Sequence, residues 1–473
     1  MISSLSLPCA IITSLTNSAT NHDLSESPDI MTSETASGNA SRAAAINIYE
    51  ILTGEEDARV CKDIPDNACN EQPVSFTLQL IAQILTKIGD GLMDVKVVLA
   101  WLMSAVGAPG AAISLIAPLR ESLSMAPQLV VAAFIRRVPV RKWFWVAGAV
   151  LQGLAVFTTA IVFLTLEGAI AGWSVVGLVV VFSLSRGICS IASKDVLGKT
   201  ISRGRRGTLS GYATSASAFV ILAFGLWLNL TGDGRSVTIL SQALIIAAAL
   251  WLAGAVVYAL LPEVPGSTSG GGNAAAVALD SIKLVVDDPD FGRFVLSRGL
   301  LLGTALSGPY FAVLAQSSGV NGLQGLGGLM VGSALAGAIS APVWGWLSDV
   351  SSRLVMVTGG MMAGVTGVAV GWLSLSNAEI LTSPYSFAIA IFILGLGHAG
   401  VRLGRKTYVV DIATSDTRSS YVAVSNTIIG LVLLAIGGIS ALVASLSIAW
   451  ALLMLSALAI AGAALSLSLK EAE

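Results

Sequence analysis

Apolar stretches of about 20 residues recur along this chain from residue 80 onward, and they constrain the fold more than any other feature. An α-helix of that length is what crosses the hydrocarbon core of a membrane. Only 11% of the residues are charged and the mean hydropathy is +0.82, whereas a soluble domain carries about 25% charged residues. The sequence therefore predicts an all-α membrane protein with twelve transmembrane helices, at residues 80–106, 110–135, 143–166, 170–192, 208–229, 237–261, 294–315, 324–347, 354–374, 386–404, 420–442 and 446–468.

Basic residues follow every second span, and this pattern predicts the topology. The loops after spans two, four, eight and ten carry Lys and Arg, whereas the loops on the opposite side contribute one basic residue, Arg235. Loops rich in Lys and Arg stay in the cytoplasm. Both termini are therefore expected in the cytoplasm, and the protein is expected in a bacterial inner (plasma) membrane.

A linker rich in Pro, Gly and Ser divides the spans into two groups of six. Residues 1–74 are expected to form a cytoplasmic extension, disordered over 1–45 and with a short helix at 46–56. Residues 75–262 then form the first six-helix bundle and residues 293–473 the second. Between them, residues 263–292 are expected to hold a short amphipathic helix capped by Asn273. The net charge of −2 gives no reason to expect nucleic acid as a partner.

The two groups of spans resemble each other at a constant offset of 212 residues. The matching pairs are Arg141 with Arg353, Gly148 with Gly360, Lys194 with Lys406 and Arg206 with Arg418. Six spans return the chain to the side where it began, so the halves are predicted to be parallel repeats.

The loop between spans eight and nine reads Gly345-Trp-Leu-Ser-Asp349-Val-Ser-Ser-Arg353. It resembles the cytoplasmic loop signature G-x-L-x-D-x-x-[GS]-R of the major facilitator superfamily, and together with the topology and the repeat this resemblance covers about residues 76–469. The resemblance implies two parallel six-helix bundles and a cytoplasmic gate in which the Asp meets a helix N-terminus and the Arg pairs with acidic residues. The gate residues that it implies are Arg141, Arg206, Gly345, Asp349, Arg353 and Arg418. In the first-half copy, Arg137 stands where the Asp is expected, which favours a plain basic loop there.

Spans three, six, nine and twelve, which the superfamily places in its outer scaffold, contain no charged residue. The charges inside the spans occur in spans one, four, seven and ten, which the superfamily places around its central cavity, and in span two. A charge at the bilayer centre costs roughly 2.5–3.5 kcal/mol on insertion scales, so it normally faces a partner or water. The candidate pathway residues are Lys87, Asp90, Asp94, Arg120, Glu121, Arg186, His398 and Arg402.

Each of these candidates also has a structural interpretation. On a continuous helix, Lys87, Asp90 and Asp94 form one stripe, and Lys96 lies roughly 200° round. Lys87 and Asp90 could instead mark the inner end of the span. Arg120 and Glu121 could form a structural ion pair with span one or eleven, and His398 could be a packed, hydrogen-bonded residue.

These features predict a secondary active transporter that moves a small organic solute by alternating access and is proton-coupled. Asp94 and Asp90 would bind the proton or cation, while Arg186 and Arg402 would neutralise them or meet an anionic part of the substrate. Pairing with Arg186 would stabilise the charged form of Asp94. The alternative is a non-transporting membrane scaffold or assembly factor with the same fold.

Motifs of enzymes are absent from the sequence, so no enzymatic activity, cofactor or metal site is expected. The expected partners are the small-molecule substrate, a coupling proton and the lipid bilayer, and the expected oligomeric state is a monomer.

Overall fold

The computed structural model describes residues 31–54, 64–125, 131, 134–135, 137–231, 236–266, 268, 284–320, 322–412 and 418–471. The regular structure of this part is helical throughout. The chain divides into two units, Met1–Ala44 and Ala45–Glu473, and the contacts described below all lie within the second. The side chains of Asp349 and Arg418 and the predicted amphipathic helix after Asn273 fall outside the described residues.

The segment before the first span is more helical than the sequence predicts. Helix α1 (Met31–Thr53) reaches back beyond the predicted helix at 46–56, and α2 (Asp66–Asn70) follows it. Buried Tyr49 packs edge-on against Phe76 at 5.3 Å between ring centroids and accepts a 3.1 Å hydrogen bond from Gln72. The second half of α1 is therefore attached to the start of the first span.

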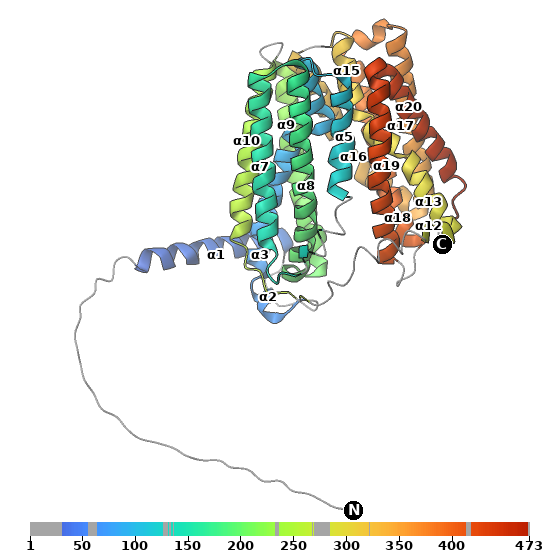
Figure 1. The fold of residues 1–473 in the computed structure, drawn as a ribbon. Helices are drawn as coiled ribbons and strands as arrows, with labels where there is room; N and C mark the ends of the chain where they lie inside the picture. The colour runs from blue at the N-terminus through green and yellow to red at the C-terminus, as the bar shows by residue number, and fades with distance from the viewer. Residues whose placement is uncertain are drawn as a thin grey trace, which may run out of the picture. The chain divides into compact units, whose positions relative to one another are not determined.

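The described helices of the N-terminal half of the second unit pack side by side (Figure 1). Helix α7 packs against α8 and α10, α3 packs against α9 and α10, and α5 packs against α8. Trp145 of α7 stacks on Tyr258 of α10 at 3.9 Å, so aromatic rings fill the space between these helices. The segments are α3 (Gln72–Leu92) continued by η1 (Val95–Leu99) and α4 (Ala100–Ala105), then α5 (Gly110–Met125), α7 (Lys142–Thr165), α8 (Gly168–Thr200), α9 (Arg203–Thr231) and α10 (Ser236–Ala259).

The C-terminal half is built in the same way. Helix α17 packs against α18 and α20, and α16 packs against α18. Gly359 lets α17 and α18 approach closely, because a Cβ there would lie 2.6 Å from the carbonyl oxygen of Gly397. The elements are α12 (Leu284–Asp287), α13 (Pro289–Leu300), α14 (Leu302–Leu306), α15 (Gly308–Ser317), α16 (Gly322–Val350), α17 (Ser352–Leu375), η2 (Glu379–Thr382), α18 (Pro384–Asp411), α19 (Arg418–Leu446) and α20 (Ile448–Ser466).

Ten segments of the described chain are long and apolar enough to cross a membrane. The two other predicted spans are present in a different form. The span predicted at 80–106 is interrupted between α3 and η1, and the span predicted at 110–135 is described as a helix over Gly110–Met125. The helical membrane fold is confirmed, while the count of twelve uninterrupted spans is not.

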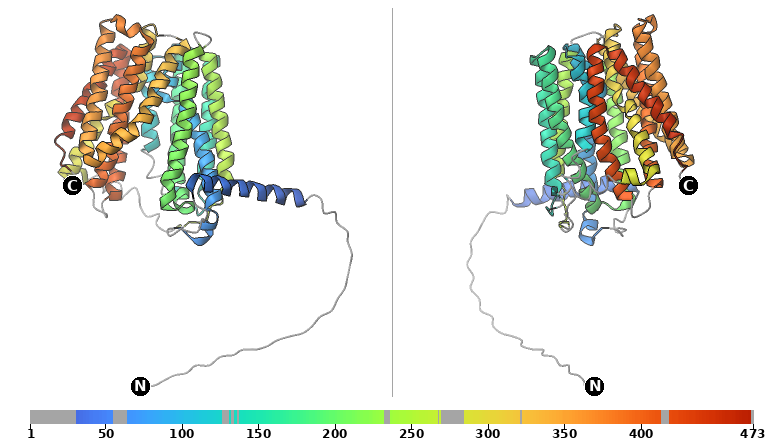
Figure 2. Two further views of the ribbon diagram at one scale, coloured as in Figure 1. Left: turned by 180° about the vertical axis from the view of Figure 1, so that it is seen from behind. Right: turned by 45° about the vertical axis from the view of Figure 1, so that its right-hand side comes forward.

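The two halves meet mainly where α5 packs against α19 and α9 packs against α16, and α15 also contacts η1 and α4. We call the end of the bundle that holds Arg141 and Arg353 the basic end; it is the lower end in Figure 1, where the C-terminus lies. Away from this end, Asn229 donates a 3.0 Å hydrogen bond to the carbonyl of Gln324, and Gln316 donates one of 3.0 Å to the carbonyl of Trp101. The contacts between the halves therefore extend to the end opposite the basic one. Figure 2 shows the same bundle from behind and turned by 45°.

Candidate functional site

The first span is broken at Asp94. Helix α3 ends at Leu92, and Asp94 adopts φ −47° and ψ 117°, which are not helical angles. Its carboxylate accepts hydrogen bonds from the amides of Lys96 (3.0 Å) and Val97 (2.8 Å), as an N-cap does, and the chain restarts as a π-helical turn. The sequence predicted one continuous helix with Lys87, Asp90 and Asp94 along one face, and this helix is interrupted at Asp94.

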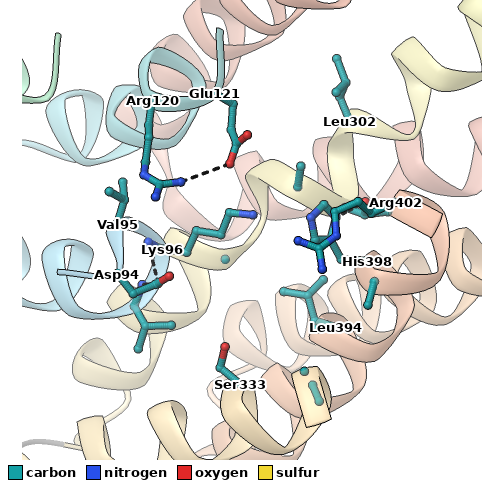
Figure 3. Close-up of a pocket in the computed structure, with 18 of the residues that line it drawn as sticks. Asp94, Val95, Lys96, Arg120, Glu121, Leu302, Ser333, Leu394, His398 and Arg402 are labelled. Carbon is teal, nitrogen blue, oxygen red and sulfur yellow. Dashed lines mark hydrogen bonds and ion pairs between the residues drawn. The ribbon is translucent and has the colours of Figure 1, made fainter. Parts of the chain in front are cut away.

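This break turns Lys96 into the space between the two halves. The stem of Lys96 lies against Gly308 at the start of α15, where an added Cβ would approach the Lys96 Cβ to 2.9 Å. In Figure 3 the ammonium group points across the pocket toward His398 and Arg402. The sequence placed Lys96 on another face because a continuous helix was assumed, and this residue was absent from the predicted pathway.

A cavity of about 310 Å³ lies between the halves, and we call it the central cavity. Five of the predicted pathway residues line it: Asp94, Arg120, Glu121, His398 and Arg402. Lys96 and Arg405 add two cations that were not among the predicted pathway residues, and Thr304 and Ser333 add hydroxyl groups. Its apolar lining comes mainly from Leu302, Ile391, Leu394, Ile429 and Leu433.

The other three predicted pathway residues gather beside this cavity, inside the N-terminal half. The carboxylate of Asp90 lies 2.5 Å from Arg186 and 3.6 Å from Arg120. Arg120 also lies 3.6 Å from Glu121, so it stands between two carboxylates. Lys87 donates to the hydroxyl of Thr214 at 3.1 Å. The predicted pairing of Asp94 with Arg186 is wrong, because the break turns Asp94 onto backbone amides and leaves Asp90 as the partner of Arg186.

A second cavity of about 340 Å³, which we call the vestibule, shares Met125 and Arg405 with the central cavity. Lys194 of α8 and Lys406 of α18, which the 212-residue repeat equates, line it from the two halves. Both residues were assigned to loops, but α8 continues to Thr200 and α18 to Asp411. Two signals in the sequence pointed to cations at this place. The repeat equates Lys194 with Lys406, and the three-residue spacing of Arg402 and Arg405 places both on one face of a continuing helix. The charged residues lining the vestibule are Arg186, Lys194, Arg298, Arg405 and Lys406.

At the basic end of the N-terminal half, an acid from a distant segment replaces the missing Asp of the loop motif. The side chain of Glu263 accepts hydrogen bonds from the amides of Arg141 (2.9 Å) and Lys142 (2.6 Å), at the N-terminus of α7. It also pairs with Lys199, and the guanidinium of Arg141 pairs with Asp195. The expectation of a plain basic loop here is therefore wrong, since four charged groups form a clamp that joins α7, α8 and the segment after α10.

The gate residues of the C-terminal half form a more open arrangement. Arg353 lies 3.1 Å from the carboxylate of Glu471 and donates to the carbonyl of Leu469 at 3.0 Å. Its pairing with an acid is what the loop resemblance implies. Gly345 lies in α16 with open space around its Cα.

Arg206, the gate residue assigned to the first half, contacts backbone rather than an acid. It donates to the carbonyls of Ile201 and Gly198, both at 2.9 Å, and so satisfies groups at the C-terminal end of α8. Within the described residues, no group of three or more His, Cys, Asp and Glu side chains is placed to hold a metal ion.

Comparison with known proteins gives matches in structure alone. Neither a protein-family model nor a curated protein sequence matches this chain. Among solved structures, the nucleoside transporter NupG matches with a TM-score of 0.63 at 13% identity, over 83% of this chain and 99% of that one. A POT family transporter in complex with a thioalcohol-conjugated peptide matches with a TM-score of 0.60 at 13% identity, over 86% and 98%.

The inward open conformation of the xylose transporter XylE from E. coli matches with a TM-score of 0.60 at 11% identity, over 84% of this chain and 96% of that one. These proteins are transporters rather than enzymes, and their likeness to this chain extends over both halves. The chain is an integral membrane protein with the fold of the major facilitator superfamily transporters.

Proposed function

We propose that this protein is a secondary active transporter that moves a small organic solute by alternating access. The observation that carries the proposal is the central cavity, which lies between the two halves and holds charged side chains from both. Asp94, Lys96 and Arg120 come from the N-terminal half, and His398 and Arg402 come from the C-terminal half. A solute bound there contacts both halves, so their relative rotation can change the side from which it is reached.

The central cavity adjoins the vestibule, with which it shares Arg405 and Met125. The vestibule is lined by Lys194 and Lys406, which lie near the C-terminal ends of α8 and α18 on the side of the basic end. Contacts such as that between Gln316 and Trp101 join the halves away from that end. We propose that the basic end faces the cytoplasm, as its Lys and Arg content favours, and that this conformation is the inward-facing state.

Asp90 is the carboxylate that we propose as the site of proton coupling. It is held by Arg186 of α8 and lies near Arg120 of α5, so movement of these helices relative to α3 changes its charge environment. Glu121 competes for Arg120 and could exchange partners with Asp90 during the same movement.

A transporter explains these charges better than a scaffold does. A charge held inside the membrane region costs free energy, which a protein used only for assembly has no need to spend on cations without acidic partners. In the described structure, no carboxylate lies within 4.0 Å of the ammonium group of Lys96 or the guanidinium group of Arg402, although both residues line the cavity. This arrangement favours transport over the alternative of a non-transporting assembly factor.

Transport can be tested before the substrate is identified. Proteoliposomes that contain the protein are exposed to a metabolite extract under an imposed pH gradient, and the contents are compared by mass spectrometry with those of protein-free liposomes. We expect at least one small solute to accumulate in proportion to the gradient. Equal contents in the two preparations, with the protein correctly folded and inserted, would contradict transport.

A further inference from the structure

The charges that line the central cavity do not balance. Its basic residues are Lys96, Arg120, Arg402 and Arg405, whereas its acidic residues are Asp94 and Glu121. The cavity lining therefore has a formal charge of +2. Asp90 and Arg186, which lie beside it, form an ion pair and leave this surplus unchanged.

The two carboxylates of the cavity are already engaged. Asp94 accepts hydrogen bonds from two backbone amides, and Glu121 lies 3.6 Å from Arg120. The ammonium of Lys96 and the guanidinium groups of Arg402 and Arg405 have no carboxylate within 4.0 Å in the described part of the chain. The Nε atom of Arg405 is also buried without a hydrogen-bond partner among the described residues.

The vestibule adds to the same charge imbalance. Five basic residues line it, and none of its lining residues in the described structure is acidic. Arg298 is the most buried of the five and, among the described residues, is hydrogen-bonded only to the neutral side chains of Ser425 and Asn426, so its charge is not cancelled there. A path lined by one sign of charge concentrates ions of the opposite sign. The route from the basic end to the central cavity therefore favours anions.

We infer that the solute is a small organic anion, with a carboxylate or phosphate group that Lys96, Arg402 and Arg405 bind. The cavity volume of about 310 Å³ suits a small solute, and Leu302, Ile391 and Leu394 offer an apolar surface to its carbon skeleton. Arginine and lysine together suit a carboxylate or phosphate, because the guanidinium binds through two N–H groups and the ammonium binds as a point charge. The inference rests on the proposed function, since it names the class of solute that the same cavity takes.

Binding to the purified full-length protein tests this inference with probes that differ mainly in charge. Succinate, its neutral diamide succinamide and the diamine putrescine have similar length, and glycerol phosphate represents the phosphate class. Each is titrated while the thermal unfolding midpoint and the intrinsic tryptophan fluorescence are recorded. We expect succinate, glycerol phosphate or both to bind, and succinamide and putrescine to bind at least about 10-fold more weakly.

Substitutions then locate the binding site. Lys96→Gln and Arg402→Gln should each weaken binding of the anion by about 10- to 100-fold, since each removes a charge-assisted contact. Arg402→Lys should retain part of the affinity. In the unsubstituted protein, whichever of succinate and glycerol phosphate binds more tightly would show whether the solute carries a carboxylate or a phosphate. Arg293→Gln is the matched control, because Arg293 is exposed, pairs with Asp290 and lies outside both cavities.

Three results would overturn the inference: preferential binding of putrescine, equal binding of succinamide and succinate, or binding of neither anion. Anion binding that Lys96→Gln and Arg402→Gln leave unchanged would also overturn it, because the anion would then sit elsewhere. Anion binding in this cavity without solute flux in proteoliposomes would contradict the proposed transport alone. Flux of a neutral or cationic solute would contradict the anion inference alone.

Discussion

The two halves of this protein both interrupt the helix that borders the central cavity, but they do so with different chemistry. In the first half the interruption is polar: Asp94 caps the restarted helix, and Lys96 extends into the cavity. In the second half α13, α14 and α15 follow one another with a Gly308-Pro309 pair at the last junction and no charge there. The 212-residue repeat equates Lys96 with Gly308, and these two residues touch. One half therefore provides the charge, and the other provides the space for it.

The halves also differ at the basic end, where the acidic residue of the N-terminal half is buried and that of the C-terminal half is exposed. The clamp of the N-terminal half is centred on Glu263, whose side chain is 0% exposed, whereas Glu471 in the C-terminal half is 61% exposed. Electrostatic contacts are stronger where water is excluded. The N-terminal half thus holds both the buried clamp and the paired charges around Asp90, and we expect it to be the half whose charges control transport.

The largest effect is expected from removing the space beside Lys96. Gly308→Val would place side-chain atoms within about 3 Å of the Lys96 stem and displace its ammonium group, and a shift of about 1 Å at a functional group can cost about 100-fold in rate. Solute uptake by proteoliposomes measures this effect. Gly438→Ala is the control, because a Cβ at Gly438 meets nothing within 4 Å. Normal uptake by Gly308→Val would show that the contact between the two breaks is unimportant.

The next effect separates the two carboxylates of the first span. Asp90→Asn should reduce accumulation driven by a pH gradient by roughly 10- to 100-fold, because its charged contacts to Arg186 and Arg120 are lost. Asp94→Asn should change it less than about threefold, because Asn caps a helix about as well as Asp. A larger loss of accumulation in Asp94→Asn than in Asp90→Asn would indicate that Asp94, rather than Asp90, is the coupling carboxylate.

The clamps at the basic end allow a comparison of stability. Glu263→Gln should lower the free energy of unfolding by about 2 kcal/mol, since Lys199 then loses one of its two acidic partners and the amides of Arg141 and Lys142 lose a charged acceptor. Glu471→Gln should lower it by less than about 1 kcal/mol, as is usual for an exposed ion pair. Thermal unfolding in detergent measures both. Equal losses would mean that the two clamps are equivalent despite their different exposure.

The smallest effect concerns the start of the seventh span, at the basic end. Asp288 caps α13 and accepts a 2.5 Å hydrogen bond from Tyr421. Although burial acts in the opposite direction, the hydrogen bonds from Tyr421 and the amides of Phe291 and Asp290 lower the pKa of Asp288 below its ordinary value of 3.8. The hydrogen bond to Asp288 raises the pKa of Tyr421 to about 12.

Because the pKa of Asp288 is lowered on folding, its contribution to stability is complete above pH 3.8 and is lost as the pH falls through the folded-state value. The contribution of Tyr421 is complete below pH 10.0 and is lost as the pH rises through about 12. Tyr421→Phe should lower the free energy of unfolding by about 1 kcal/mol near neutral pH and by less below pH 3.8. A loss that does not depend on pH would show that the hydrogen bond is not responsible.

The features that could be predicted from the sequence are those that depend on the residue types within a single segment of the chain. The apolar spans, the basic end and the presence of Asp90, Arg120 and Arg402 within the membrane region follow from local residue type. The break at Asp94 could not be predicted in this way, because a side-chain cap competes with continuation of the helix and packing decides between them. The same break explains why Lys96 was missed and why Asp94 was assigned the partner that Asp90 has.

Contacts between segments that are distant in the chain could not be predicted from local sequence patterns either. Glu263 reaches the amide of Arg141 across 122 residues, and nothing near Arg141 indicates that acid. Arg405 was placed in a loop because the end of α18 is set by tertiary packing rather than by a stop signal. The second error underestimated how far α18 continues at the basic end, where the vestibule lies.

Movement of the two halves about the central cavity is tested most directly by pulsed EPR distances in the reconstituted protein. Spin labels carried by noncanonical amino acids would replace Lys194 and Lys406, which line the vestibule from opposite halves, and in a second sample Leu230 and Leu446 near the opposite end. Our account predicts that succinate shortens the Lys194–Lys406 distance while the Leu230–Leu446 distance grows, and that Gly308→Val abolishes both changes. Distances at both ends that stay constant with and without the anion, in protein that binds it, would contradict alternating access.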